Sequence, residues 1–193
     1  MNGALEAYLH ADLLNSESKW VIRRIAGCYR SLKQPKEALK YYHRYEALNP
    51  DNLSVQISIG HCHLELKDYN EALKCFFKVD YLDNKSHKAW RPIAWCSFLT
   101  GKYDQARNYY KKILDNQPNT QDLLNAGHTE WALQNIKGAL SFYQQAVQKE
   151  NGNFLKFQEQ FNQDVADLLI AGIEEAEVAL MLDQLRYKME GEI

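Results

Sequence analysis

The chain has 193 residues, of which 46% are hydrophobic and 25% are charged, and these values exclude a disordered or collagen-like chain. The 23 Lys and Arg residues nearly balance the 25 Asp and Glu residues, and the net charge is -2. No overall basic field is therefore available to attract a polyphosphate backbone, and nucleic acid is not an expected partner.

A regular spacing of alanines and aromatic residues runs along the chain. The alanines are Ala4, Ala38, Ala72 and Ala106, each 34 residues after the one before, and Ala139, which follows after 33. An aromatic residue stands four positions after each alanine, a spacing that places both side chains on one helical face. These aromatic residues are Tyr8, Tyr42, Phe76, Tyr110 and Tyr143.

A second column lies earlier in each unit, where a very small residue follows an apolar or small one. The pairs are Ile25-Ala26, Ile59-Gly60, Ile93-Ala94 and Ala126-Gly127. A very small residue lets two helix axes come to the short end of the roughly 8 to 10 Å packing range, and the aromatic ring fills the space beside it. Turn signals at 33–35, 67–69, 101–103 and 134–136 separate the two columns. The pattern predicts interlocking antiparallel helix pairs.

These small residues, aromatics and turns over 34 residues resemble the tetratricopeptide repeat family. The resemblance implies an all-α fold, namely a right-handed α-α superhelix (solenoid) of antiparallel helix pairs. In chain order, residues 1–18 would form the second helix of an incomplete N-terminal repeat, 19–153 four repeats, and 154–193 a C-terminal capping helix pair. Pro92 lies inside the first helix of the third repeat and lacks a backbone donor, which predicts a kink or a late helix start.

The C-terminal segment departs from the period but keeps helical patterns. One apolar stripe follows three-four spacing and consists of Phe154, Phe157, Phe161, Val165 and Leu168. A last helix over 173–189 is expected to turn four apolar residues inward: Ile173, Ala176, Leu180 and Leu185.

Residues that suggest chemistry have structural explanations. His61, Cys62 and His63 are consecutive, so on a helix they point about 100° apart and cannot converge on a metal ion. Cys28, Cys62 and Cys96 recur at one repeat position, which predicts thiols too far apart for a disulfide and favours a reducing, cytoplasmic location. The sequence has no glycine-rich phosphate loop, nucleophile elbow or zinc spacing, so we expect neither an enzyme nor a cofactor.

Function is expected on the face that packing leaves free. In the family, the first helix of each repeat lines the inside of the superhelix, so the resemblance implies a concave groove built from those helices. The groove candidates are Trp20, Arg23, Arg30, Ile57, His61, Lys88, Arg91, Trp95, Phe98, Leu124, His128 and Trp131. Aromatic anchors and cations of this kind suit an acidic, partly aromatic peptide or partner protein.

The leading hypothesis is therefore a scaffold or adaptor that binds a protein partner in the groove. The alternative is a ligand-sensing regulatory arm of a larger protein whose effector domain lies outside this chain. Self-association through the open N-terminal repeat is a further hypothesis, because a lone second helix leaves the flank at Leu5 and Leu9 uncovered. No apolar run reaches the roughly 18 residues of a membrane helix, so no membrane partner is expected.

Overall fold

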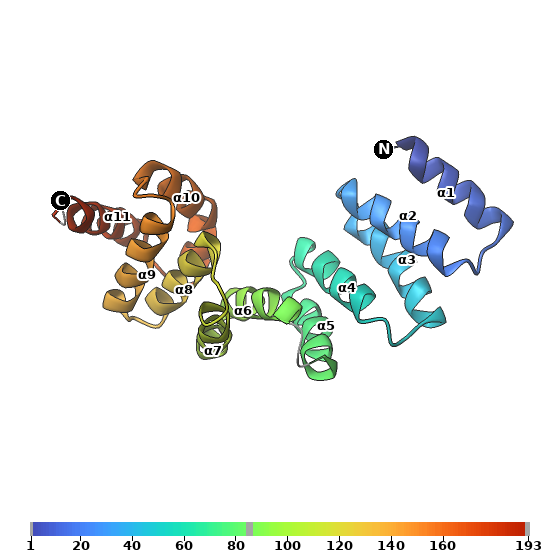
Figure 1. The fold of residues 1–193 in the computed structure, drawn as a ribbon, viewed down its shortest axis with the longest axis horizontal. Coiled ribbons are helices and arrows are strands. Elements are labelled where there is room, and N and C mark those ends of the chain that lie inside the picture. Colours follow the sequence, from blue (N-terminus) through green and yellow to red (C-terminus); the bar gives the residue numbers. More distant parts are fainter. Residues whose placement is uncertain (1, 84–86, 192–193) are drawn as a thin grey trace. The chain divides into compact units, whose positions relative to one another are not determined.

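The computed structural model describes residues 2–83 and 87–191, and over these residues every regular element is a helix (Figure 1). The helices are α1 (Asn2–Leu14), α2 (Lys19–Ser31), α3 (Pro35–Leu48), α4 (Leu53–Glu65), α5 (Tyr69–Leu82), α6 (Trp90–Leu99), α7 (Tyr103–Leu114), α8 (Thr120–Ala132), α9 (Ile136–Lys149), α10 (Phe154–Ile170) and α11 (Glu175–Glu190). A short 3₁₀ turn, η1 (His87–Ala89), precedes α6. The expected all-α fold is confirmed.

The helices form two compact units, Met1–Pro92 and Ile93–Ile193. In the first unit, each of the helices α1 to α5 packs against the next one in the chain, and Figure 1 shows α2 and α3 side by side. In the second unit, α7 packs on α8 and α8 on α9, while α10 contacts α8, α9 and α11. The short connections make neighbouring helices antiparallel.

The predicted turns inside the helix pairs share one backbone conformation. Lys33, Lys67, Gly101 and Gln134 each follow a helix and have a left-handed φ between 58° and 71°. In the first turn, the Gln34 amide donates to the Tyr29 carbonyl and the Lys33 amide to the Arg30 carbonyl, the two bonds of a Schellman cap. The cap reverses the chain within three residues, which is why the two helices of a pair lie against each other.

The small and aromatic columns meet inside these pairs, as the spacing predicted. Tyr42, Phe76, Tyr110 and Tyr143 are all at least 95% buried, with exposed fractions of 5%, 0%, 2% and 0%. A Cβ atom added to Gly60 would lie 2.7 Å from Cε1 of Phe76, and one added to Gly127 would collide with the Tyr143 ring. Only glycine allows helix and ring to approach this closely at these two positions.

Pro92 shortens the helix in which it lies. The 3₁₀ turn occupies His87–Ala89, and α6 begins at Trp90, so Pro92 falls in the first turn of the helix. Its missing N–H costs no helical hydrogen bond there, because the first amides of a helix have no partner inside it. The predicted late helix start is confirmed.

The last helix has a different buried face from the one predicted. Ile173 and Leu185 are buried as expected, and Val178 and Met181 join them. Ala176 is exposed, however, and Leu180 is 56% exposed, so placing these two inward was wrong. The physical reason is packing: α11 contacts α9 and α10, and its buried side chains, Val178, Met181 and Leu185, lie on one stripe at three-four spacing.

Candidate functional site

The structure divides the twelve predicted groove residues into exposed, half-buried and buried groups. Trp20, Arg23, Lys88 and Arg91 are exposed, and Arg30, Ile57, His61 and Trp95 are half-buried. Phe98, Leu124, His128 and Trp131 are buried, with exposed fractions of 2%, 0%, 0% and 3%. The expectation of an open surface position does not hold for these last four.

Helices α9 and α10 of the second unit contact two of these side chains, His128 and Trp131. The His128 ring lies 5.2 Å from the Phe161 ring of α10, and its Nδ1 is 2.8 Å from the Tyr143 hydroxyl of α9. Trp131 packs edge-on against the same Tyr143, at 6.4 Å between ring centroids. Because α10 packs on α8, the helix face that the spacing assigned to solvent is an interface in this unit.

Among the hollows in the described part of the first unit, a pair meets along α2. The larger, of about 690 Å³, lies among α1, α2 and α4 and is lined by residues that include Trp20, Arg23, Arg24, Gly27, Tyr42 and Ser58. The second, of about 520 Å³, is lined by Gly27, Arg30, Ser31, Lys33, Tyr42 and Glu65. Gly27, Ser31 and Tyr42 border both hollows. We call the joined surface the α2 groove.

An aromatic ring and a stacked cation form one end of the α2 groove. Trp20 is 58% exposed, and its ring meets the Tyr8 ring of α1 edge-on at 5.5 Å. The Arg24 guanidinium lies 5.3 Å from the centroid of the Trp20 ring, a cation–π distance. Arg24 was not among the predicted groove residues, although its position four residues after Trp20 places both side chains on the same helical face.

The other end of the α2 groove holds one weak ion pair. Arg30 Nε lies 3.4 Å from Glu65 Oε1 of α4, and the two side chains are 37% and 28% exposed. At such exposure an ion pair contributes only about 0–1 kcal/mol, so a ligand carboxylate can displace Glu65 at little cost. Arg23 forms no hydrogen bond or ion pair with any residue in 2–83 or 87–191. Its guanidinium is available to an incoming anion.

The remaining predicted residues lie apart from this surface. The His61 ring meets the Phe76 ring edge-on at 5.2 Å, and burial lowers the pKa of His61, so its neutral form is favoured. Trp95 stacks on the buried Phe98 at 5.2 Å. Ile57, Lys88 and Arg91 line neither hollow of the α2 groove.

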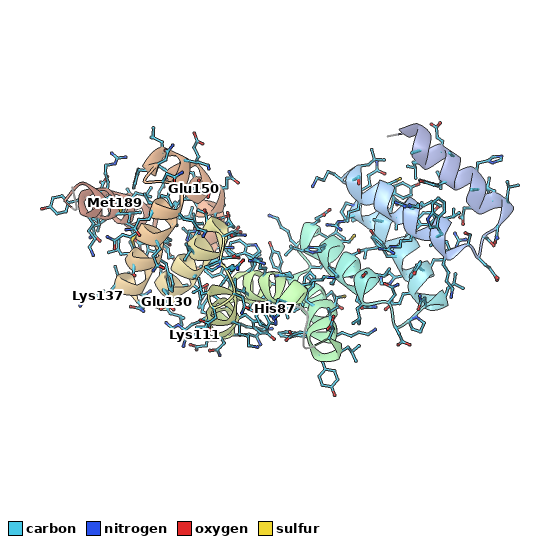
Figure 2. All side chains as sticks on the ribbon, viewed as in Figure 1. His87, Lys111, Glu130, Lys137, Glu150 and Met189 are labelled. Atoms are coloured by element: carbon cyan, nitrogen blue, oxygen red, sulfur yellow. The ribbon has the colours of Figure 1, made fainter. Side chains whose placement is uncertain are left out.

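The second unit has a partly buried charge cluster that joins two of its helices. Arg107 donates two hydrogen bonds of 2.7 Å to Glu130, and Asn135 Nδ2 donates a third of 2.6 Å. Burial alone would raise the pKa of Glu130, but the hydrogen bonds from Arg107 and Asn135 and the charge of Lys111 lower it instead. Figure 2 marks Glu130 and Lys111 on this unit. The carboxylate is held ionised and ties α8 to α7.

Thiol, metal and membrane features add no further site. Cys28, Cys62, Cys75 and Cys96 are free, and burial raises the pKa of Cys62 to about 11 and of Cys96 to about 12, which makes these two thiols poor nucleophiles. Across the described ranges, no three His, Cys, Asp or Glu side chains are grouped to hold a metal ion. No helix in this part of the chain has the length and apolar character to cross a bilayer.

Two family models match the chain. The model for subunit 3 of the anaphase-promoting complex, cyclosome, matches residues 5–79, and a tetratricopeptide repeat model matches residues 93–120. The chain is a tetratricopeptide repeat protein. A comparison of this repeat protein with curated proteins by sequence finds no match.

Solved structures of other repeat proteins share the fold. MamA is 15% identical, with a TM-score of 0.71 over 78% of this chain and 89% of that chain. A MamA structure from Desulfovibrio magneticus RS-1 is 18% identical, with a TM-score of 0.69 over 88% and 96% of the two chains. YrrB, described as a TPR protein with an unusual peptide-binding site, is 16% identical, with a TM-score of 0.67 over 95% of this chain and 100% of that chain. At these identities the likeness concerns the fold alone.

Proposed function

We propose that this tetratricopeptide repeat protein is a protein-interaction scaffold whose α2 groove holds an acidic peptide segment of a partner protein. The observation that carries the proposal is the charge of the groove. Four cationic side chains line it, namely Arg23, Arg24, Arg30 and Lys33, and the single carboxylate among the residues named for it is Glu65. A segment rich in Asp or Glu complements this surface.

The shape and size of the groove support a peptide. A hollow of about 690 Å³ falls within the range of roughly 300–1,000 Å³ for ligand sites. Trp20 offers a broad, exposed ring of the type that dominates binding energy at interfaces. YrrB, a protein of the same fold, has a peptide-binding site, which adds support from a distant relative.

The spacing of the arginines suggests the spacing of the ligand's charges. Arg23 and Arg30 are seven residues apart on α2, which corresponds to about 10.5 Å of helix rise. Three residues of a peptide in the polyproline II conformation span about 9 Å and complete one turn, so side chains three residues apart point to the same side. We therefore propose a ligand with two carboxylates three residues apart, each able to pair with one guanidinium.

A charge reversal in the groove tests this function. The probe is a fluorescein-labelled peptide with the core Glu-Phe-Gly-Glu between Gly-Ser flanks, and binding is followed by fluorescence anisotropy. Arg23→Glu should weaken binding about tenfold or more, because it replaces an attraction with a repulsion. Far-ultraviolet circular dichroism should show an unchanged helix content, since Arg23 is exposed and forms no hydrogen bond or ion pair with the described residues.

Lys36→Glu is the matched control. It makes the same change in net charge on an exposed residue of α3 that lines neither hollow. The control should bind the probe peptide within about twofold of the wild type, because only the long-range charge has changed. Equal affinities of the wild type and Arg23→Glu would overturn the proposed function.

A further inference from the structure

Gly27 is a helix-interior glycine that packing does not explain. It is the ninth of the thirteen residues of α2, where glycine weakens a helix relative to alanine. A Cβ atom added there would meet nothing within 4 Å. Gly60 and Gly127, by contrast, each face an aromatic ring that leaves no room for a methyl group. Gly27 therefore leaves space that the fold itself does not use.

The equivalent positions of the other repeats carry rings where Gly27 has none. At the 34-residue spacing, Gly27 corresponds to His61, Trp95 and His128. The His61 ring lies edge-on against Phe76 at 5.2 Å, and the His128 ring edge-on against Tyr143 at 5.6 Å. Phe76 and Tyr143 stand at the repeat position that Tyr42 occupies in the first pair. Tyr42 thus lacks the ring that packs on Phe76 and on Tyr143, and it borders both hollows of the α2 groove.

We propose that the space above Gly27 is a subsite for one aromatic side chain of the acidic peptide, which takes the place of the missing ring and packs against Tyr42. This inference rests on the proposed function and adds the residue that sets its specificity. The subsite lies between the cations, because Gly27 is four residues after Arg23 and three residues before Arg30. The carboxylates that flank the aromatic residue in the peptide then reach these two guanidinium groups.

The chemistry of the walls favours a ring over an aliphatic chain. An aromatic side chain can pack edge-on against Tyr42, as the two histidines do in the equivalent places. The Arg23 and Arg24 guanidinium groups line the same hollow and can lie over the face of the ring. A backbone without a side chain at 27 also lets the peptide main chain approach α2 closely.

Filling the subsite from the protein side tests the inference. The two probes are fluorescein-labelled peptides with the cores Glu-Phe-Gly-Glu and Glu-Ala-Gly-Glu between identical Gly-Ser flanks. The wild type should bind the Phe probe about tenfold more tightly than the Ala probe, as expected for burial of one ring. Gly27→His, which supplies the ring of the equivalent repeats, should bind both probes with the weaker affinity. Gly27→Ala should reduce the preference in part.

The controls separate this inference from the proposed function. Lys36→His places the same ring on α3 outside the groove and should keep the tenfold preference. Gly27→His and Gly27→Ala should be at least as stable as the wild type in urea, which excludes unfolding as the cause of lost preference. An unchanged preference in Gly27→His would overturn the subsite while the Arg23→Glu result still stands. Failure of the wild type to bind either probe would overturn both proposals.

Discussion

Adding one methyl group to Gly60 and to Gly27 should change stability in opposite directions. Both glycines lie inside helices of the first unit, so alanine gains about 0.5–1 kcal/mol of helix stability at either position. At Gly27 nothing lies within 4 Å of the new Cβ, and the gain should be realised in full. At Gly60 the new Cβ would lie 2.7, 2.8 and 3.0 Å from three carbons of the Phe76 ring. These distances fall well inside the contact optimum of about 3.5–4.0 Å between carbon atoms.

The magnitude follows from the burial of Phe76. Its exposed fraction is 0%, so the ring cannot turn into solvent and α4 and α5 must separate instead. Overpacking of this kind typically costs about 1–3 kcal/mol. The net effect of Gly60→Ala should therefore be a loss of up to about 2 kcal/mol. Because the helix contribution is the same at both sites, the difference between the two variants, about 1–3 kcal/mol, measures the overpacking alone.

Urea titrations followed by circular dichroism at equal protein concentration supply the two free energies of unfolding. The double variant Gly60→Ala with Phe76→Leu should lose less stability than the sum of its single changes, since a smaller side chain makes room for the methyl group. If Gly60→Ala proved as stabilising as Gly27→Ala, helix and ring would not be in the close contact described, and the explanation of the glycine column would be wrong.

Two further predictions concern a turn and a buried histidine. Lys67→Gly should raise the free energy of unfolding, measured by urea titration, by about 0.5–1 kcal/mol. Lys67 has φ 63°, and glycine adopts this conformation without the steric penalty of a Cβ atom. A loss of stability in this variant would contradict the strain argument. Burial lowers the pKa of His128, although the Asp164 carboxylate 3.5 Å from Nε2 opposes this effect. Below about pH 6.5 the unfolded chain then binds a proton that the folded chain does not, so stability should fall as the pH drops from about 7 to 5. His128→Gln keeps a hydrogen-bonding group near Tyr143 and should lose less stability over this pH window. Burial also lowers the pKa of His61 in both proteins, so only the difference between the two plots of unfolding free energy against pH, measured in urea, reports His128. Identical slopes of the two plots would refute the assignment.

The α2 groove shows which lining residues spacing along the chain can indicate and which it cannot. Trp20, Arg23 and Arg30 were predicted from their spacing on one face of a helix, and in the structure they line the α2 groove. Arg24 was not predicted, because it lies outside the single stripe of α2 from which the candidates came. In the structure, residues on a wider arc of this helix line the groove. Gly27 was not among the predicted groove residues. The role proposed for Gly27 depends on the empty space around it, which the spacing of residues along the chain does not reveal.

By itself, the sequence determined the local architecture of this protein. Alanine or glycine at one repeat position and a ring at another specify helix pairs that interlock, because steric fit between adjacent turns depends on spacing along the chain alone. Residues such as Tyr42 and Phe76 are buried for this reason.

Only the tertiary structure decided which of the remaining helix faces meet solvent. Phe98, His128 and Trp131 occupy the same face as Trp20 and Arg23, yet helices of the second unit cover them. Leu180 was expected inside and is exposed, because α11 contacts α9 and α10 and buries the stripe of Val178, Met181 and Leu185 instead. Periodicity defines the stripe of a helix, but burial depends on whether a neighbouring helix, distant in sequence, packs over that stripe.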